Sequence, residues 1–209
     1  IVINATVSSG QNIRRRGQDL TKGTLALARG TRIRPQEMGL LASTGINRVP
    51  VLAKLKVAIL TTGDELVDPG QPLAPGQIYN TNRYTLKALL QQSGCRITLA
   101  ETLKDDRETT RQTLEQAAQH ADLILTSGGV SVGEEDHVRQ VLEQHGSLDI
   151  WRLAMKPGKP LAFGSLHGTP VRGLPGNPAA ALVTFLVIAL PWIRRCQGES
   201  GDARPRGER

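Results

Sequence analysis

From about Leu55 to Cys196 the chain alternates short apolar runs of strand length with longer helical segments. The strand-like runs are LKVAIL, RITLAETL, DLILTSG, DIWRLAM, KPLAFGSL and TPVRGL. A helical segment such as TNRYTLKALLQQSG stands between them, with Leu86, Leu89 and Leu90 on one face. This alternation predicts a doubly wound, mostly parallel α/β sheet with helices on both faces. The HGT between the last two runs predicts a hairpin and therefore an antiparallel edge.

The sequence on either side of this region is predicted to form separate parts of the chain. Residues 1–54 lack the alternation and are predicted to be a partial N-terminal segment with a linker. This segment offers short strand-like pieces, which are interrupted by Gly10, Gly17, Gly23 and Gly30. A helix is predicted in PQEMGLLAST, with Pro35 in its first turn. Residues 55–197 are the predicted α/β domain, and residues 198–209 are predicted to be a disordered tail or the truncated start of another domain.

Composition narrows the class of partner. The formal charge of +7 favours an anionic ligand such as a nucleotide or a phosphorylated metabolite. Aromatic residues make up only 3% of the chain and there is no basic recognition helix, so a nucleic-acid partner is not expected.

Two further features point to a reducing, aqueous compartment. Cys95 and Cys196 are isolated, which fits the cytoplasm better than a disulfide framework. The most apolar run, residues 179–193, is shorter than the ~20 residues of a membrane span and contains Pro191, so it is predicted to be a buried helix.

The segments that follow the predicted strands carry the candidate chemistry. In open α/β sheets the ligand binds beyond the carboxyl ends of the strands. Those segments are TTGDEL, KDD, TSGGVSVGEED, KPGKP and PGNP. Glycine N–H groups and lysines suit phosphate oxygens, and carboxylates suit Mg²⁺. The glycine loop is neither a P-loop nor a GxGxxG fingerprint.

Each of these segments also has a purely structural interpretation. The glycines can serve tight turns, and the acids can cap helices. The histidines are scattered, and all four are predicted to lie on the surface rather than to bind metal: His120, His137, His145 and His167.

Six ordered strings closely resemble the molybdopterin molybdenumtransferase family, which includes MoeA and the E domain of gephyrin. They are TTGDEL, GQIYNTNR, KDD, TSGGVSVGEED, KPGKPLAFG and GLPGNP. GQDLTKG and PQEMGLLASTGI also resemble the family's segment ahead of that domain. The resemblance implies an enzyme of molybdenum cofactor biosynthesis, which inserts molybdate into adenylylated molybdopterin and releases AMP.

The resemblance also implies roles for individual residues. Glu65, Asp105, Asp136 and Lys156 match residues that the family uses at its site, and are expected to be catalytic. Asp136 and Glu65 are the expected metal ligands. The expected substrate-binding residues are Thr62, Gly63, Asp64, Ser127, Gly128, Gly129, Ser131, Gly133, Lys159, Pro175, Gly176 and Pro178.

The expected cofactor is Mg²⁺, with molybdate and adenylylated molybdopterin as substrates. A homodimer is expected, with a molybdopterin adenylyltransferase as a further partner, in the cytoplasm and without nucleic acid or membrane. One departure concerns Asn80, which stands where relatives can carry aspartate, so no metal is placed there.

Two alternative functions stay open at this point. A molybdopterin adenylyltransferase shares the expected fold, although its glycine loop typically reads GGTG before the acids. A non-catalytic molybdopterin-binding module is the other alternative, because the C-terminal β domain of the family would start where this sequence stops.

Overall fold

The computed structural model describes residues 6, 8–129, 136–152 and 160–199 of the chain. The chain divides into two compact units, Ile1–Val51 and Leu52–Arg209.

The first unit contains one helix, α1 (Pro35–Ser43), among its described residues. Pro35 occupies the first helical turn, as predicted. The Arg34 guanidinium donates to the Glu37 carboxylate at 2.6 Å, and this hydrogen bond lowers the pKa of Glu37 to about 2. The prediction of strand-like pieces ahead of this helix is wrong for described residues 8–34, which form turns. Most of these residues are exposed, and their backbone pairs with no strand in the described part of the chain.

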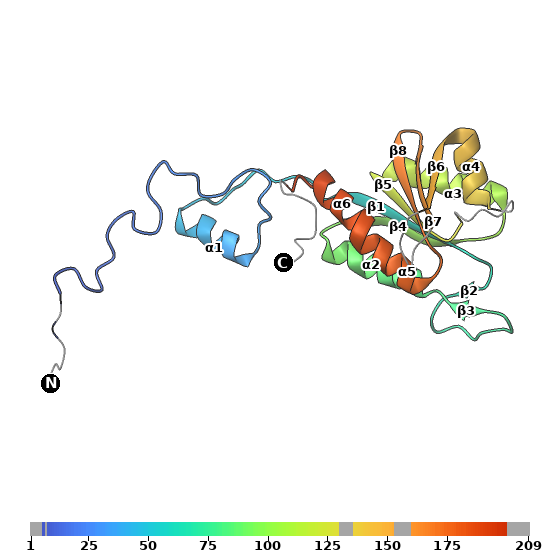
Figure 1. Ribbon diagram of the computed structural model, residues 1–209, viewed down its shortest axis with the longest axis horizontal. Helices are drawn as coiled ribbons and strands as arrows, with labels where there is room; N and C mark the ends of the chain where they lie inside the picture. The colour runs from blue at the N-terminus through green and yellow to red at the C-terminus, as the bar shows by residue number, and fades with distance from the viewer. Residues whose placement is uncertain (1–5, 7, 130–135, 153–159, 200–209) are drawn as a thin grey trace. The chain divides into compact units, whose positions relative to one another are not determined.

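The second unit is built on a six-stranded sheet in the order β4-β1-β5-β8-β7-β6 (Figure 1). Four strands are parallel: β1 (Lys56–Thr62), β4 (Arg96–Leu103), β5 (Leu123–Ser127) and β8 (Thr169–Leu174). β7 (Pro160–Leu166) is antiparallel both to β8 and to β6 (Gly146–Arg152). The predicted mostly parallel sheet with an antiparallel edge is therefore confirmed.

Helices cover both faces of this sheet, because alternate side chains of each strand point to opposite faces. Val57 and Ile59 pack in one buried cluster with Leu86 of α2 (Thr81–Gln92). Ala58 and Leu60 pack in the other with residues of α3 (Arg107–His120) and α4 (His137–His145).

The last helical segment consists of three consecutive elements: α5 (Pro178–Thr184), a π-helical turn η1 (Phe185–Ala189) and α6 (Leu190–Cys196). Leu190 N–H bonds to Phe185 O in the wide turn, directly before Pro191, which has no N–H to donate. The run Pro178–Cys196 is long and apolar enough to cross a membrane by length and composition alone. Phe185 and Ile193 are fully buried in the core, whereas Leu186 and Val187 are exposed, so the predicted buried helix is buried on one face only.

A short arm projects between β1 and α2. Its two-residue strands β2 (Leu66–Val67) and β3 (Ile78–Tyr79) run parallel to each other. Ile78 N–H donates to Glu65 O at 2.8 Å, and Asn80 N–H donates to Val67 O at 2.9 Å. The arm therefore begins at Glu65 and returns the chain to the start of α2.

Candidate functional site

The sheet topology brings the predicted strand ends to one edge. β1, β4, β5 and β8 are parallel, so their carboxyl ends lie on the same side. β6 has the same direction as β8, because both are antiparallel to β7. The rule for ligand sites in open α/β sheets therefore points to this edge.

The start of the glycine loop packs directly on the end of β1. Gly128 and Gly129 have φ of +81° and +66°, a region that side chains disfavour. A Cβ at Gly128 would lie 2.7 Å from Thr62 Oγ1 and 3.0 Å from Thr62 O. A Cβ at Gly176 would lie 3.8 Å from the Cα of Gly128. A side chain at Gly128 would therefore force the loop away from β1, whereas Gly176 approaches Gly128 at an ordinary contact distance.

Asn82, in the first turn of α2, holds two of these strand ends together. Its side-chain amide donates to Ser127 Oγ at 2.8 Å and to Gly176 O at 2.6 Å. Ser127 Oγ in turn donates to Pro175 O at 3.1 Å, in a buried position. The predicted residues Ser127, Pro175 and Gly176 therefore form one hydrogen-bonded unit around Asn82.

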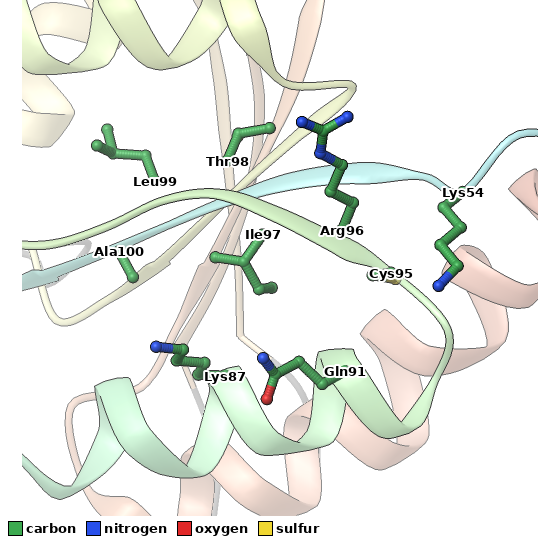
Figure 2. Close-up of a pocket in the computed structure, with 9 residues that line it drawn as sticks. All are labelled: Lys54, Lys87, Gln91, Cys95, Arg96, Ile97, Thr98, Leu99 and Ala100. Atoms are coloured by element: carbon green, nitrogen blue, oxygen red, sulfur yellow. The ribbon is translucent and has the colours of Figure 1, made fainter.

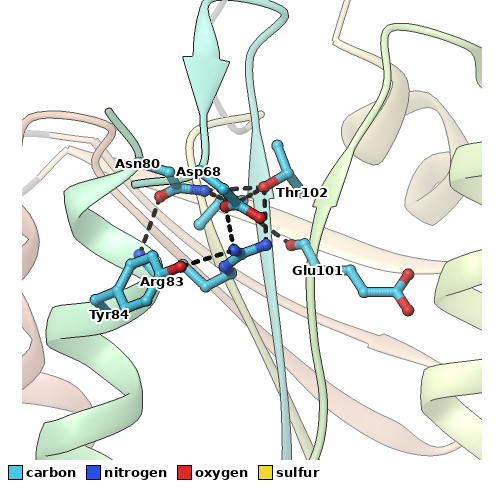
Figure 3. Close-up of polar contacts among 7 residues, drawn as sticks. Asp68, Asn80, Arg83, Tyr84, Glu101 and Thr102 are labelled. Atoms are coloured by element: carbon cyan, nitrogen blue, oxygen red, sulfur yellow. Dashed lines mark hydrogen bonds and ion pairs between the residues drawn. The ribbon is translucent and has the colours of Figure 1, made fainter. Parts of the chain in front are cut away.

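A second network joins the arm, α2, β1 and β4 (Figure 3). Asn80 is fully buried, and its amide donates to Thr61 Oγ1 at 2.7 Å and Thr102 Oγ1 at 2.9 Å. Arg83 forms an ion pair with Asp68 of the arm and also donates to Thr102 Oγ1. The hydrogen bond to Asp68 raises the pKa of Arg83. This network fixes the base of the arm that carries Glu65.

Acidic residues gather after β1 and β4. Asp64 Oδ1 accepts a hydrogen bond from Asp105 N–H at 3.1 Å. Asp105 Oδ1 lies 3.0 Å from His137 Nε2. Asp106 caps α3 by accepting from Thr109 N–H, and hydrogen bonds from the Thr109 side chain first and from this N–H second lower the pKa of Asp106. The structure thus brings the predicted residues Asp64 and Asp105 together.

The two expected metal ligands are each engaged locally. The Glu65 carboxylate folds back over Gly63, where any Cβ would overlap it. Asp136 is the N-cap of α4 and accepts from Arg139 N–H at 3.0 Å. Within the described parts of the chain, no three His, Cys, Asp or Glu side chains group as a metal site requires. Mg²⁺ usually takes only one or two protein carboxylates together with substrate phosphates, so Glu65 and Asp136 stay candidate ligands without an assembled site among the described residues.

The remaining predicted residues divide into two sets. Pro178 is exposed and occupies the first turn of α5, which Asn177 caps. Ser131, Gly133, Lys156 and Lys159 lie outside the described residues.

An open hollow lies elsewhere, along the first part of β4 (Figure 2). Lys54, Lys87, Gln91 and Arg96 contribute to its lining, and none of the predicted site residues does. Cys95 also lines it, but burial raises the pKa of this thiol to about 11, which makes it a poor nucleophile at neutral pH. The hollow is therefore distinct from the edge where the strand ends meet.

Three residues that make contacts in the site were not among the predicted site residues. Asn82 and Arg83 lie in the motif GQIYNTNR but were given no role. His137, predicted to lie on the surface, is partly buried with 24% of its side chain exposed, and it pairs with Asp105, which was not predicted. His137 directly follows GEED, one of the segments predicted to form the site, and this position indicates that its side chain could take part in the site.

Comparison with known proteins identifies the family. Residues 58–195 match the family described as "Probable molybdopterin binding domain". Residues 1–45 match the "MoeA N-terminal region (domain I and II)". The first match covers the sheet except the first two residues of β1, and it includes all of the strand ends described above.

Relatives agree with this assignment. The molybdopterin molybdenumtransferase of Haemophilus influenzae is 47% identical over 93% of this chain and 48% of its own length. Molybdopterin molybdenumtransferase 2 of Mycobacterium tuberculosis is 38% identical over 98% of this chain and 52% of its own length. The chain thus spans about half the length of these curated relatives.

A solved structure supports the same conclusion. The molybdopterin biosynthesis MoeA protein from Pyrococcus horikosii superposes with a TM-score of 0.78 at 36% identity, covering 88% of this chain and 46% of that one. The sheet order, the glycine-mediated contacts of the strand ends and these matches together show that the chain belongs to the molybdopterin-binding domain family.

Proposed function

We propose that this chain binds adenylylated molybdopterin at the carboxyl edge of its sheet and takes part in inserting molybdate into it, with release of AMP. The observation that carries the proposal is the approach of Thr62, Gly128 and Gly176 at that edge, within a domain that matches the family over residues 58–195. The printed names of the relatives, molybdopterin molybdenumtransferase, supply the reaction class.

The site's own residues suit two parts of this task. The glycines leave no side chain between the backbone and a ligand at the strand ends, which lets phosphate oxygens approach main-chain N–H groups. Asp64 and Asp105 follow β1 and β4 at the same edge of the sheet, with Asp105 60% exposed and able to contact polar groups of a ligand. Lys156 and Lys159 belong to the proposal as the cations that offset phosphate charge during release of AMP.

Further details of the proposal come from the family resemblance alone. The working form is proposed to be a cytoplasmic homodimer that receives its substrate from a molybdopterin adenylyltransferase. A need for Mg²⁺ is also part of the proposal, but no step is assigned to the ion, because the described residues form no cluster to hold it.

The decisive experiment is a titration of the 209-residue chain with adenylylated molybdopterin, first alone, then with Mg²⁺, and then with molybdate. Bound pterin and released AMP are measured in the same samples. We expect saturable pterin binding and AMP release that depends on molybdate.

Other outcomes separate the rival functions. Binding without AMP release would favour the non-catalytic molybdopterin-binding module. Formation of adenylylated molybdopterin from ATP and molybdopterin would favour the adenylyltransferase. Failure to bind the pterin nucleotide under all three conditions would contradict the proposed function.

A further inference from the structure

His137 makes a direct contact with an acid of the candidate site. Its Nε2 lies 3.0 Å from Asp105 Oδ1, a normal hydrogen-bond distance. His137 is the first residue of α4, directly after the N-cap Asp136, so the helix start fixes its backbone. The ring is the more buried partner: 24% of the His137 side chain is exposed, against 60% for Asp105.

The surroundings of the ring define which nitrogen can donate. Nδ1 is buried and has no hydrogen-bond partner among the described residues. A proton on Nδ1 would therefore be a buried, unsatisfied donor, which is unfavourable. A proton on Nε2 points to the Asp105 carboxylate instead, so the arrangement selects the Nε2–H tautomer.

Asp105 is the carboxylate that this donor holds. The neighbouring Asp106 is already committed to capping α3, where its carboxylate accepts from Thr109 N–H at 2.7 Å. Asp105 makes no such cap; its backbone N–H donates to Asp64, which leaves its carboxylate to His137. The residue is thus held at two points, by its main chain and by its side chain.

We propose that His137 is a positioning residue that orients the Asp105 carboxylate toward the ligand through the Nε2–Asp105 hydrogen bond. This inference rests on the proposed function, in which Asp105 contacts the substrate. A largely exposed carboxylate samples several rotamers, and a fixed donor from α4 restricts it to one of them. The orientation matters in the reaction because small displacements of catalytic groups reduce rates strongly.

The test compares three variants. His137→Leu removes the donor, His137→Gln keeps an N–H near the Nε2 position, and His145→Leu is the control at the exposed end of the same helix. We expect His137→Leu to lower kcat for AMP release by about 10- to 100-fold with KM changed less than about threefold. His137→Gln should retain kcat within about threefold, and His145→Leu should match the wild type. Thermal unfolding of each variant reports folding separately.

Two kinetic results would overturn the inference. One is unchanged kcat in His137→Leu. The other is an equal loss in His137→Leu and His137→Gln, which would assign the effect to packing of the ring rather than to the donor.

The inference is also measurable if the wild-type chain releases no AMP, a result that would count against the proposed function alone. Histidine side chains labelled with ¹⁵N report the tautomer directly by NMR. We expect His137 to show the Nε2–H tautomer, and Asp105→Ala to change its Nε2 and ring signals. An Nδ1–H tautomer, or a His137 spectrum unaffected by Asp105→Ala, would contradict the proposal.

Discussion

Gly128→Ala is expected to destabilise the domain by about 2–5 kcal/mol and to abolish measurable pterin binding. The φ of +81° costs an L-residue about 1–2 kcal/mol. The new Cβ would also lie 2.7 Å from Thr62 Oγ1 and 3.0 Å from Thr62 O, and such overpacking costs about 1–3 kcal/mol. Because the loop must move away from β1 to relieve the contact, the edge that binds the ligand changes shape. Urea unfolding and a pterin-binding titration measure the two effects.

Gly76→Ala is the matched control for this substitution. Gly76 has nearly the same φ, +83°, but a Cβ added there would meet no atom of the described residues within 4 Å. It should therefore show only the backbone cost of about 1–2 kcal/mol and bind the pterin normally. The double variant Thr62→Ala/Gly128→Ala should recover part of the loss, since it removes Oγ1 but not the Thr62 carbonyl. Equal destabilisation by Gly76→Ala and Gly128→Ala would show that the close contact with β1 is unimportant.

Asn80→Ala is expected to destabilise the domain by about 2–4 kcal/mol. Asn80 caps α2 by accepting from Arg83 N–H at 3.1 Å, and loss of an N-cap costs about 1 kcal/mol. The same side chain donates to Thr61 Oγ1 and Thr102 Oγ1 from a fully buried position. Each of these hydrogen bonds contributes about 0.5–1.5 kcal/mol. The measurement is the shift in the free energy of unfolding in urea.

Asn177→Ala provides the comparison, because Asn177 caps α5 in the same way but is exposed. It should cost only about 1 kcal/mol, the value of the cap alone. The difference between the two variants isolates the bonds of Asn80 to β1 and β4. If the two substitutions had equal effects, the buried network in Figure 3 would contribute nothing to stability.

Local patterns predicted most of the fold. Pro35 placed the start of α1 correctly, because a helix start depends on residues within one turn. The predicted apolar face of α2, Leu86, Leu89 and Leu90, is also confirmed by its packing in the first core cluster.

Features that depend on distant partners were not predictable in this way. The two-residue strands β2 and β3 are held by backbone bonds across the arm rather than by β propensity. The pairing of His137 with Asp105 requires α3 and α4 to lie side by side, which no local pattern encodes. The same holds for Asn82, whose two acceptors are 45 and 94 residues away in the sequence.

The candidate site also contains features that the sequence predicts and features that depend on distant partners. The topology brings the predicted segments to one edge of the sheet, because parallel strands end on one side. The contacts among the residues at this edge depend on how the strand ends pack, which the sequence does not show. The predicted residues therefore include Ser127, which donates a hydrogen bond to Pro175 O, as well as Pro178, which is exposed.

The most direct test of the account is to find which backbone amides respond when adenylylated molybdopterin is added to the ¹⁵N-labelled chain. We expect the amide signals of Gly63, Asp105, Gly128 and Gly176 to shift with a common affinity, because these residues lie at the carboxyl edge of the sheet. Signals from Gln91 and Thr98, at the hollow beside the first part of β4, should stay unchanged. Shifts confined to that hollow, with the carboxyl edge unaffected, would contradict the proposed binding site.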